Sequence, residues 1–313
     1  MLLSPAFAAA QTDPKFDYAK VEPVKPETAQ VVEWKAQAKA GGLWTGGNSQ
    51  VKSALIGVTA SRKQGANKLS LEGTLAYGRS NVWQTLPSAT TPGDVDIERN
   101  EVTTTNNFLA KGRYDRFFTQ NNAGYVSAQA AGDRIAGKTF FGGGQIGYSR
   151  QLLKNDMNLV VAEIGYDFSY ETYLQPPAGK APLEAVAVHS ARLFAGETLK
   201  LSSATGIVAS VEALLNLNRE SKALNHVDGS TGVDAFKDTR LLGKAALTTT
   251  VYKALSLAVG FTVKYDQNPA PLPLGPILMG ATLAPDQYAS TKNQPFAETT
   301  DYQTEATLIY TFL

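Results

Sequence analysis

Residues 298–313, with the sequence ETTDYQTEATLIYTFL, decide the fold. In an extended strand, successive side chains point to opposite faces, so alternate residues share a face. One face of this stretch is apolar, with aromatic residues towards its end: Tyr302, Thr304, Ala306, Leu308, Tyr310 and Phe312. The other face is polar and charged: Asp301, Gln303, Glu305 and Thr307. A strand that separates lipid from water needs this division, and the same pattern recurs along the chain.

The composition narrows the class of protein. The 313 residues are enough for one large domain or two ordinary ones. The 29 basic and 28 acidic residues give a net charge of +1, so nothing indicates a nucleic-acid partner. Cysteine is absent, which excludes disulfides, thiolate metal sites and cysteine nucleophiles, and suits passage through an oxidising periplasm. No stretch has the roughly 20 apolar residues of a spanning helix, whereas a barrel needs only alternate ones.

The N-terminal part is expected to lie outside the folded unit. Residues 1–10, MLLSPAFAAA, resemble the end of a secretory signal, with small residues at a cleavage site near Ala8 to Ala10. A basic n-region is missing, so either the start is truncated or the segment is not a signal. Residues 11–30 are polar and contain three prolines, which predicts a flexible leader. We therefore expect a residual signal at 1–10, a leader at 11–30 and a barrel at 31–313.

Period-two alternation continues almost without interruption from Val31, and helical periodicity is scarce. It predicts about twelve strands, many of them longer than the five or six residues typical of soluble sheets. Their predicted ranges are 32–43, 51–62, 68–79, 100–116, 122–133, 139–152, 158–174, 184–199, 205–220, 238–251, 255–267 and the terminal strand. The facing of residues 122–133 and 184–199 is ambiguous, so the predicted count carries a margin of two strands.

The predicted connections alternate in length. Short ones fall at 63–67, 117–121, 154–157, 202–204 and 252–254, and longer ones at 80–99, 175–183, 221–237 and 268–297. The last of these contains six prolines, which cannot donate hydrogen bonds to a sheet. Tight turns on one side and long loops on the other are typical of bacterial outer-membrane barrels. This arrangement predicts that both termini face the periplasm.

A soluble sandwich or lipocalin-like barrel would also alternate, but with its apolar face inward. The charges on the polar faces of the strands favour a membrane barrel, because a wet or ion-paired interior accommodates them. The residues predicted to line the lumen are Glu33, Lys39, Glu72, Lys111, Arg113, Glu163, Asp167, Glu171, Glu212, Arg240, Lys244, Lys264 and Glu305. The residues predicted to face lipid are Tyr77, Phe108, Tyr114, Ile164, Tyr166, Phe168, Phe261, Tyr265, Leu308, Tyr310 and Phe312.

Several segments resemble the bacterial salt-induced outer-membrane protein family, a domain of unknown function numbered 481. They are Asp238-Thr-Arg-Leu241, residues 251–269 (VYKALSLAVGFTVKYDQNP), 42–49 (GLWTGGNS), 111–118 (KGRYDRFF) and 308–312 (LIYTF). The resemblance extends from about Trp34 to the C-terminus and implies an outer-membrane β-barrel of uncertain function. Members usually end on the aromatic residue, so Leu313 departs from the pattern. The resemblance brings no catalytic residues with it.

Three other motifs have simpler explanations. Residues 142–147, GGGQIG, satisfy G-x-G-x-x-G, but strand-like flanks favour a glycine-rich strand that bulky neighbours approach closely over a nucleotide-binding loop. Asp94, Asp96 and Glu98 alternate without an EF-hand pattern, which favours a solvated acidic loop over a cation site. His189 is the candidate for a hydrolase on the barrel wall. Ser190 points to the opposite face and cannot be its partner.

The resulting prediction is an all-β, transmembrane, antiparallel up-and-down barrel of about twelve strands in the bacterial outer membrane. Its function is a small porin-like channel with a polar, charged lumen, or a structural barrel. The alternatives are an outer-membrane lipid hydrolase and a surface receptor or adhesin that acts through 80–99 and 268–297. We expect a monomer without catalytic residues, metal or cofactor. Its expected partners are outer-membrane lipid and lipopolysaccharide, the barrel-assembly machinery during insertion, and no nucleic acid.

Overall fold

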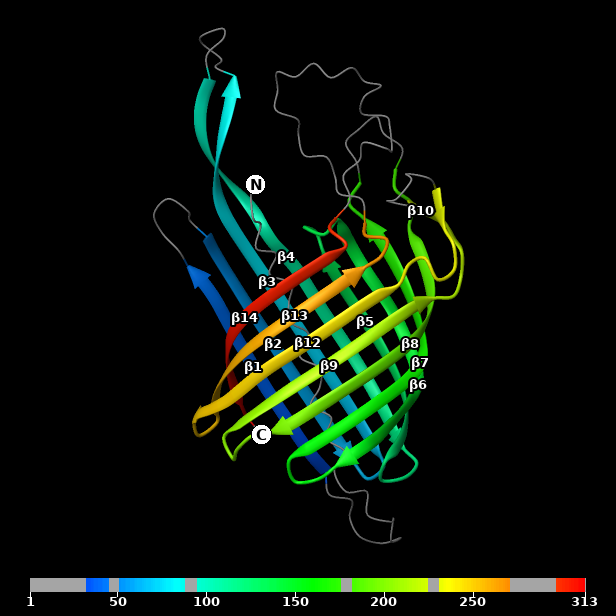
Figure 1. The fold of residues 1–313 in the computed structure, drawn as a ribbon. Coiled ribbons are helices and arrows are strands. Elements are labelled where there is room, and N and C mark those ends of the chain that lie inside the picture. Colours follow the sequence, from blue (N-terminus) through cyan, green and yellow to red (C-terminus); the bar gives the residue numbers. More distant parts are fainter. Residues whose placement is uncertain are drawn as a thin grey trace.

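The computed structural model describes residues 32–44, 51–87, 95–175, 182–224, 231–270 and 297–312. Within these ranges it is an all-β structure in which twelve strands form a closed barrel (Figure 1). The barrel strands are β1 (Val32–Trp44), β2 (Val51–Gln64), β3 (Asn67–Pro87), β4 (Val95–Phe117), β5 (Asn122–Asp133), β6 (Lys138–Lys154), β7 (Asn158–Tyr173), β8 (Val186–Lys200), β9 (Thr205–Asn216), β12 (Arg240–Tyr252), β13 (Leu255–Asp266) and β14 (Thr300–Thr311). The described residues contain no helix that could cross a membrane.

Each barrel strand pairs antiparallel with its neighbours in the chain, and β9 pairs with β12 across an inserted hairpin. That hairpin consists of β10 (Glu220–Leu224) and β11 (Thr231–Val233). The up-and-down fold and the predicted number of strands are therefore confirmed. The predicted signal remnant at 1–10, the leader at 11–30 and most of the loop at 268–297 lie outside the described residues.

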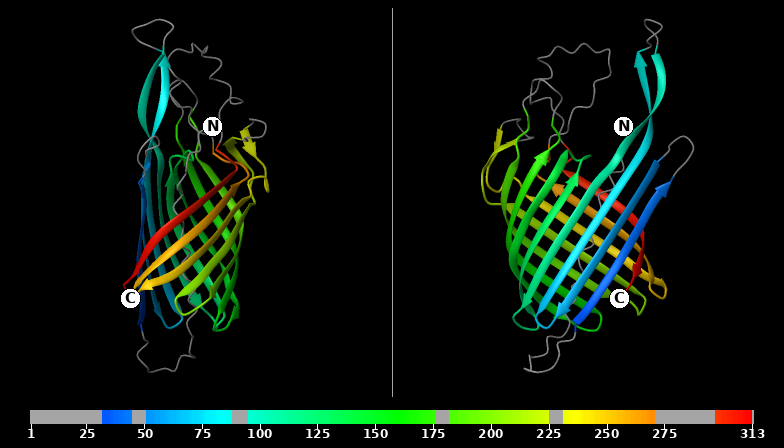
Figure 2. Two further views of the ribbon diagram at one scale, coloured as in Figure 1. Left: turned by 60° about the vertical axis from the view of Figure 1, so that its left-hand side comes forward. Right: turned by 180° about the vertical axis from the view of Figure 1, so that it is seen from behind.

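Two of the predicted long loops are wrong in part. Residues 80–99 were expected to be a loop, but β3 runs to Pro87 and β4 starts at Val95, and their pairing extends from Ser80–Val102 to Pro87–Val95. The two strands form a hairpin that projects beyond the barrel in Figure 2. The predicted loop at 221–237 contains β10 and β11. Both errors have the same cause. The polar residues in these segments predict the end of a strand in lipid, but outside the membrane the backbone pairing of strands can continue in water.

The hairpin of β10 and β11 packs against the end of β8 through a small apolar cluster. This cluster contains Val186, Val188, Ala223 and Val233, with Tyr173 against it. Asn216, the last residue of β9, is buried, and its side-chain amide donates to the carbonyl oxygens of Asn218 and Asp234. The amide nitrogen of Asp238 donates to the Asn216 side-chain oxygen at 2.9 Å. Asn216 therefore fixes both ends of the inserted segment.

The short turn at 134–137 between β5 and β6 lies at one end of the barrel, but five other short turns lie together at the opposite end, which we call the short-turn end (Figure 1). They connect β2 to β3, β4 to β5, β6 to β7, β8 to β9 and β12 to β13. Gly65 in the first of them has φ +57°, a conformation that glycine adopts without steric cost. Strand β1 starts and β14 stops at this end as well. The even strand number and the uniform antiparallel pairing require this placement.

Closure depends on the pairing of β1 with β14, which is the shortest contact between strands of the barrel. Four Cα pairs join them, from Gln37–Thr311 to Ala40–Leu308, and the amide of Phe312 donates to the Ala36 carbonyl at 2.9 Å. By contrast, β1 pairs with β2 along its whole length, from Val32–Gln64 to Trp44–Lys52. The closing seam therefore lies towards the short-turn end.

Engineered cysteines can test this register, because the chain contains no cysteine of its own. Ala38 and Tyr310 are partners on the outer face of the seam, and directly opposite residues are close enough for a disulfide. We expect Ala38→Cys with Tyr310→Cys to form a disulfide that changes mobility on a non-reducing gel. The control, Ala38→Cys with Ile309→Cys, places the thiols on opposite faces and is expected to stay reduced. Efficient cross-linking of the control pair would contradict the register.

Candidate functional site

The outer face of the barrel is rich in apolar and aromatic side chains. Ten of the residues predicted to face lipid are exposed there: Tyr77, Phe108, Tyr114, Ile164, Tyr166, Phe168, Phe261, Leu308, Tyr310 and Phe312. Tyr265, predicted to be in the same class, is instead half-buried and borders the cavity described below. Two outer aromatics cover glycines, because the Phe108 ring lies over Gly132 and the Phe140 ring over Gly142.

The face enclosed by the barrel is polar, and the predicted lumen residues fall into distinct environments. Lys39, Glu72, Arg113, Glu163, Asp167 and Glu171 are buried, and Lys111, Glu212, Arg240, Lys244, Lys264 and Glu305 are partly buried. Glu33 is exposed near the start of β1. Lys39 lies within electrostatic range of Glu305 and Glu72, which brings charges from β1, β14 and β3 together. The structure distributes the other charges over two further clusters.

The first of these, the wall cluster, consists of Arg113, Asp115, Glu163, Arg192 and Glu212. Arg113 contacts Asp115 at 2.8 Å and Glu163 at 2.6 Å. Arg192 contacts Glu163 at 2.7 Å and Glu212 at 2.8 Å. Arg113 on β4 and Glu163 on β7 are not on neighbouring strands, so their side chains must pass over β5 and β6 on the inner side. Each guanidinium binds two carboxylates, and this pairing offsets the cost of removing the charges from water.

A flat recess in the wall allows these side chains to cross. The hydroxyl of Tyr125 would lie 2.6 Å from a Cβ atom at either Gly147 or Gly165, so only glycine leaves room for the phenol. The Arg113 guanidinium is 4.1 Å from the centre of the Tyr125 ring, and Arg192 donates to its hydroxyl at 2.7 Å. The glycine-rich segment 142–147 therefore lies in strand β6 and accommodates an aromatic neighbour, as the simpler explanation expected.

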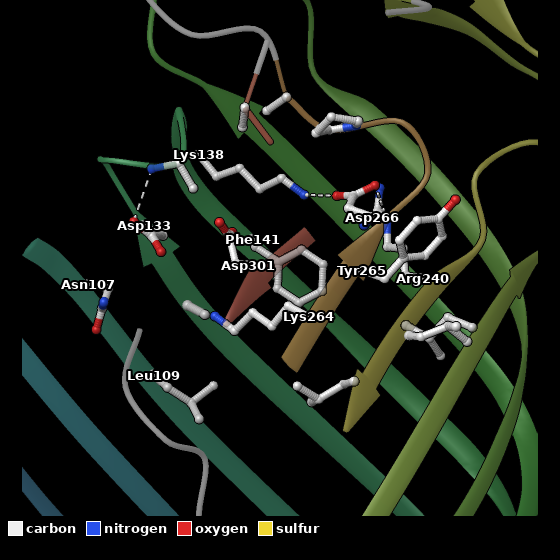
Figure 3. A pocket seen from close by; sticks show the side chains of 18 of the residues that line it. Asn107, Leu109, Asp133, Lys138, Phe141, Arg240, Lys264, Tyr265, Asp266 and Asp301 are labelled. Atoms are coloured by element: carbon white, nitrogen blue, oxygen red, sulfur yellow. Dashed lines mark hydrogen bonds and ion pairs between the residues drawn. The ribbon is translucent and has the colours of Figure 1, made fainter. Parts of the chain in front are cut away.

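The second, the cross-lumen cluster, consists of Lys138, Glu171, Asp238, Arg240 and Asp266 at the end opposite the short turns. Lys138 on β6 contacts Glu171 at 3.0 Å and Asp266 on β13 at 3.3 Å. Arg240 binds Glu171 and contacts Asp238 at 2.8 Å. Four strands separate β6 from β13 on one side of the barrel and six on the other, so the Lys138–Asp266 pair nearly spans it. This pair therefore bridges opposite walls across the mouth (Figure 3).

The charges of the cross-lumen cluster do not balance, because three carboxylates meet two cations. Asp238 lies in the segment before β12, outside the strand, and is buried. Burial, together with the nearby carboxylates of Asp266 and Glu171, raises the pKa of Asp238 to about 6, although Arg240 opposes this rise. Asp238 is therefore a group in this cluster that can take up a proton in weakly acidic solution.

A cavity of about 310 Å³ opens beside the cross-lumen cluster. Its apolar lining comes from Leu109, Ala131, Phe141, Leu214 and Leu242, and its charged lining includes Lys111, Asp133, Lys244, Lys264 and Asp301. Figure 3 shows Phe141, Lys264 and Asp301 directed into the same space, beneath the Lys138–Asp266 pair. The lining comes from β4, β5 and β6 on one wall and β9, β12, β13 and β14 on the other. The cavity therefore extends across the barrel.

The other candidate residues do not form a reactive group. The His189 ring lies on the outer face, where it binds the Tyr166 hydroxyl and contacts the Phe168 ring at 5.2 Å between centroids. Ser190 is buried on the opposite face, as expected. Asp94 and the side chains of Asp96 and Glu98 lie outside the described residues. Within the described ranges, no group of three or more histidines and carboxylates could hold a metal ion.

Several members of the two clusters were missed by the sequence analysis. Asp115 follows Arg113 by two residues, and Asp238 and Asp266 lie on the polar faces of predicted strands, so alternation could have identified all three. Arg192 shares a face with Ser190, but the ambiguous alternation of its strand hid this. Lys138 precedes a register shift between Lys138 and Phe140, which places it on the inner face against simple alternation. No pattern in the sequence predicts this register shift.

Breaking the wall cluster tests whether it stabilises the barrel. We expect Arg192→Met to lower the free energy of unfolding by about 3–5 kcal/mol, because the buried Glu163 and the partly buried Glu212 each lose a cationic partner. A second substitution, Glu212→Leu, should restore part of this loss. The control is Arg79→Met, which removes an exposed ion pair with Glu101 and is expected to change nothing measurable. Urea unfolding in detergent micelles supplies the comparison, and equal effects of Arg192→Met and Arg79→Met would contradict the prediction.

Comparisons with known proteins give one family match and several remote likenesses to solved structures. The family model described as "Protein of unknown function, DUF481" matches residues 38–273, and no curated protein matches the chain. The NanC porin structure has 6% identity, with coverage of 89% of this chain and 100% of that chain and a TM-score of 0.43. The translocator domain of autotransporter NalP from Neisseria meningitidis has 13% identity, with coverage of 92% and 90% and a TM-score of 0.40.

A Pseudomonas aeruginosa FadL homologue has 11% identity, with coverage of 91% of this chain and 75% of that chain and a TM-score of 0.34. Likenesses with TM-scores this low carry no argument about this chain. The family match is different in kind, because it spans most of the chain and includes every strand from β2 to β13. This chain, an outer-membrane-type barrel of twelve strands, belongs to the DUF481 family of proteins of unknown function.

Proposed function

We propose that the protein is a narrow pore for small polar solutes in the bacterial outer membrane, with the short-turn end towards the periplasm. The observation that carries this proposal is the cross-lumen cluster beside a charged cavity. A barrel that serves only as a structural element has no need of a hollow of about 310 Å³ with opposite charges on its walls. Twelve strands also fall between the packed interior of eight and the open channel of sixteen to eighteen.

The outer surface supports the location in a membrane. Along β14, Tyr302, Leu308 and Tyr310 are exposed, and aromatic residues stand near both ends of the strand. A band of this kind, with aromatics at its edges, is typical of strands that cross an outer membrane. The structure gives less support to the alternative of a lipid hydrolase, because the ring of its candidate residue, His189, packs beside the Tyr166 and Phe168 rings.

The cross-lumen cluster would control both the width and the selectivity of the pore. Two cations and three carboxylates crowd the mouth at the cavity, so any solute that passes through the cavity moves beside these charges. Charged groups at a constriction select ions by their sign. Removal of one charge should therefore change the selectivity in a direction that depends on the charge removed.

Planar-bilayer recording with the full-length protein tests this proposal. We expect the wild-type protein to produce discrete conductance steps. Lys138→Met leaves excess carboxylates and should shift the reversal potential towards cation preference, whereas Asp266→Asn should shift it towards anions. Each variant should also raise the unit conductance, because each breaks the bridge between the walls.

Lys222→Met is the matched control, because Lys222, on the inserted hairpin, forms an exposed ion pair with Glu184. Lys222→Met should leave both the reversal potential and the unit conductance unchanged. Pure, folded protein that gives no ion-selective steps would refute the pore and leave a structural barrel. Conductance steps whose ion selectivity is the same in the wild-type protein and in both variants would show that ions do not pass beside the cross-lumen cluster.

A further inference from the structure

The cavity separates its charges by depth. On one wall, Asp133 on β5 is the register partner of Asn107 on β4. Lys111 lies on β4 as well, four residues further towards the short-turn end than Asn107. On the opposite wall, Lys264 pairs with Asp301, and Lys244 pairs with Thr262, two residues deeper. At about 3.3 Å per residue, these offsets correspond to roughly 7–13 Å along the strands. The carboxylates of Asp133 and Asp301 are therefore near the mouth, and Lys111 and Lys244 are deeper.

The charged residues of the cavity near the mouth, Asp133, Lys264 and Asp301, are not part of the cross-lumen cluster. Lys264 lies between Asp133 and Asp301 and interacts electrostatically with both. Lys138, the register partner of Asp133, is already paired with Glu171 and Asp266, so Asp133 and Asp301 outnumber the remaining cation, Lys264, at this level. Among the described residues, Lys111 has no ion-pair partner, so its ammonium group is available to a ligand.

An apolar strip joins the two levels. Phe141 points into the cavity from β6, and Leu109 lies between Asn107 and Lys111 on the inner face of β4. Leu242 and Leu214 contribute from the opposite wall. The volume of about 310 Å³ is at the lower end of the range for pockets that hold small organic molecules. A ligand that fits this lining has an anionic group at one end, a cationic group at the other and an apolar body.

We propose that the cavity binds a small zwitterion with an apolar body, of the kind that an aromatic α-amino acid represents. The carboxylate of the ligand lies deep, at Lys111 and Lys244, and its ammonium group lies near the mouth, at Asp133 and Asp301. Its apolar part packs against Phe141 and the leucines. This inference deepens the proposed pore by naming a class of solute.

Calorimetric titration of the full-length barrel in detergent micelles tests this with four probes. L-Phenylalanine carries both charges and the ring, 3-phenylpropionate lacks the amine, phenethylamine lacks the carboxylate, and glycine lacks the apolar body. We expect L-phenylalanine to bind most tightly. Loss of either charged group, or of the ring, should weaken binding by about tenfold, the order of one charge-assisted hydrogen bond.

Two charge variants should then separate the ends of the ligand. Lys111→Gln should weaken L-phenylalanine and 3-phenylpropionate about tenfold and leave phenethylamine unchanged. Asp301→Asn should weaken L-phenylalanine and phenethylamine and leave 3-phenylpropionate unchanged. Phe141→Ala should weaken all three aromatic probes. The control, Lys222→Gln, changes a lysine that does not line the cavity and should bind every probe like the wild-type protein.

Folding of each variant is checked by its mobility as an unheated sample on a gel, which reports the closed barrel. Equal affinities for the three aromatic probes, or equal losses of every probe in both charge variants, would overturn the inference. Absence of binding at millimolar concentration would also overturn it. A protein that conducts ions but binds no zwitterion refutes this inference alone, and one that binds the zwitterion but does not conduct refutes only the pore.

Discussion

Lipid offers no hydrogen bonds, and this constraint determines the rest of the structure. A sheet in a membrane must pair every strand edge, so it closes on itself. A closed sheet has an inner and an outer face. Because side chains alternate along a strand, every second residue points to the inner face and the others point to the outer face. The exposed faces of β7 and β14 carry Ile164, Phe168, Leu308 and Tyr310, whereas Glu163, Asp167 and Glu171 face inward. The four-pair contact of β1 with β14 is the step that makes this separation possible.

Charged side chains inside the barrel need partners of opposite charge, and the shape of the inner wall allows them to meet. Glycines at 147 and 165 let the Tyr125 ring lie flat, and Arg113 and Arg192 lie against that ring and reach Glu163 from two sides. The result is a dense wall cluster along β4 to β9. The cross-lumen cluster differs from it, because Lys138 and Asp266 come from nearly opposite walls. One cluster therefore stiffens the wall, and the other constrains the passage.

The sequence predicted the fold closely because lipid imposes a strict period of two. The strand at 158–174 shows the clearest alternation, and the structure has β7 at Asn158–Tyr173. The errors occur where this constraint ends. Beyond the membrane, β3 and β4 continue as a hairpin through residues expected to form a loop. The site was less predictable, since alternation identifies inward charges but not which of them meet. Lys138 reaches Asp266 over 128 positions of sequence, and a register shift beside Lys138 conceals its facing.

The central claim is that the apolar face meets lipid and the charged face meets an enclosed, wet interior. Spin labels placed one at a time at residues 164, 166, 167, 168 and 169, in protein reconstituted into vesicles, test it most directly. We expect labels at 164, 166 and 168 to collide mainly with oxygen, which concentrates in lipid, and labels at 167 and 169 mainly with a water-soluble nickel complex. The opposite alternation, or none, would contradict the account.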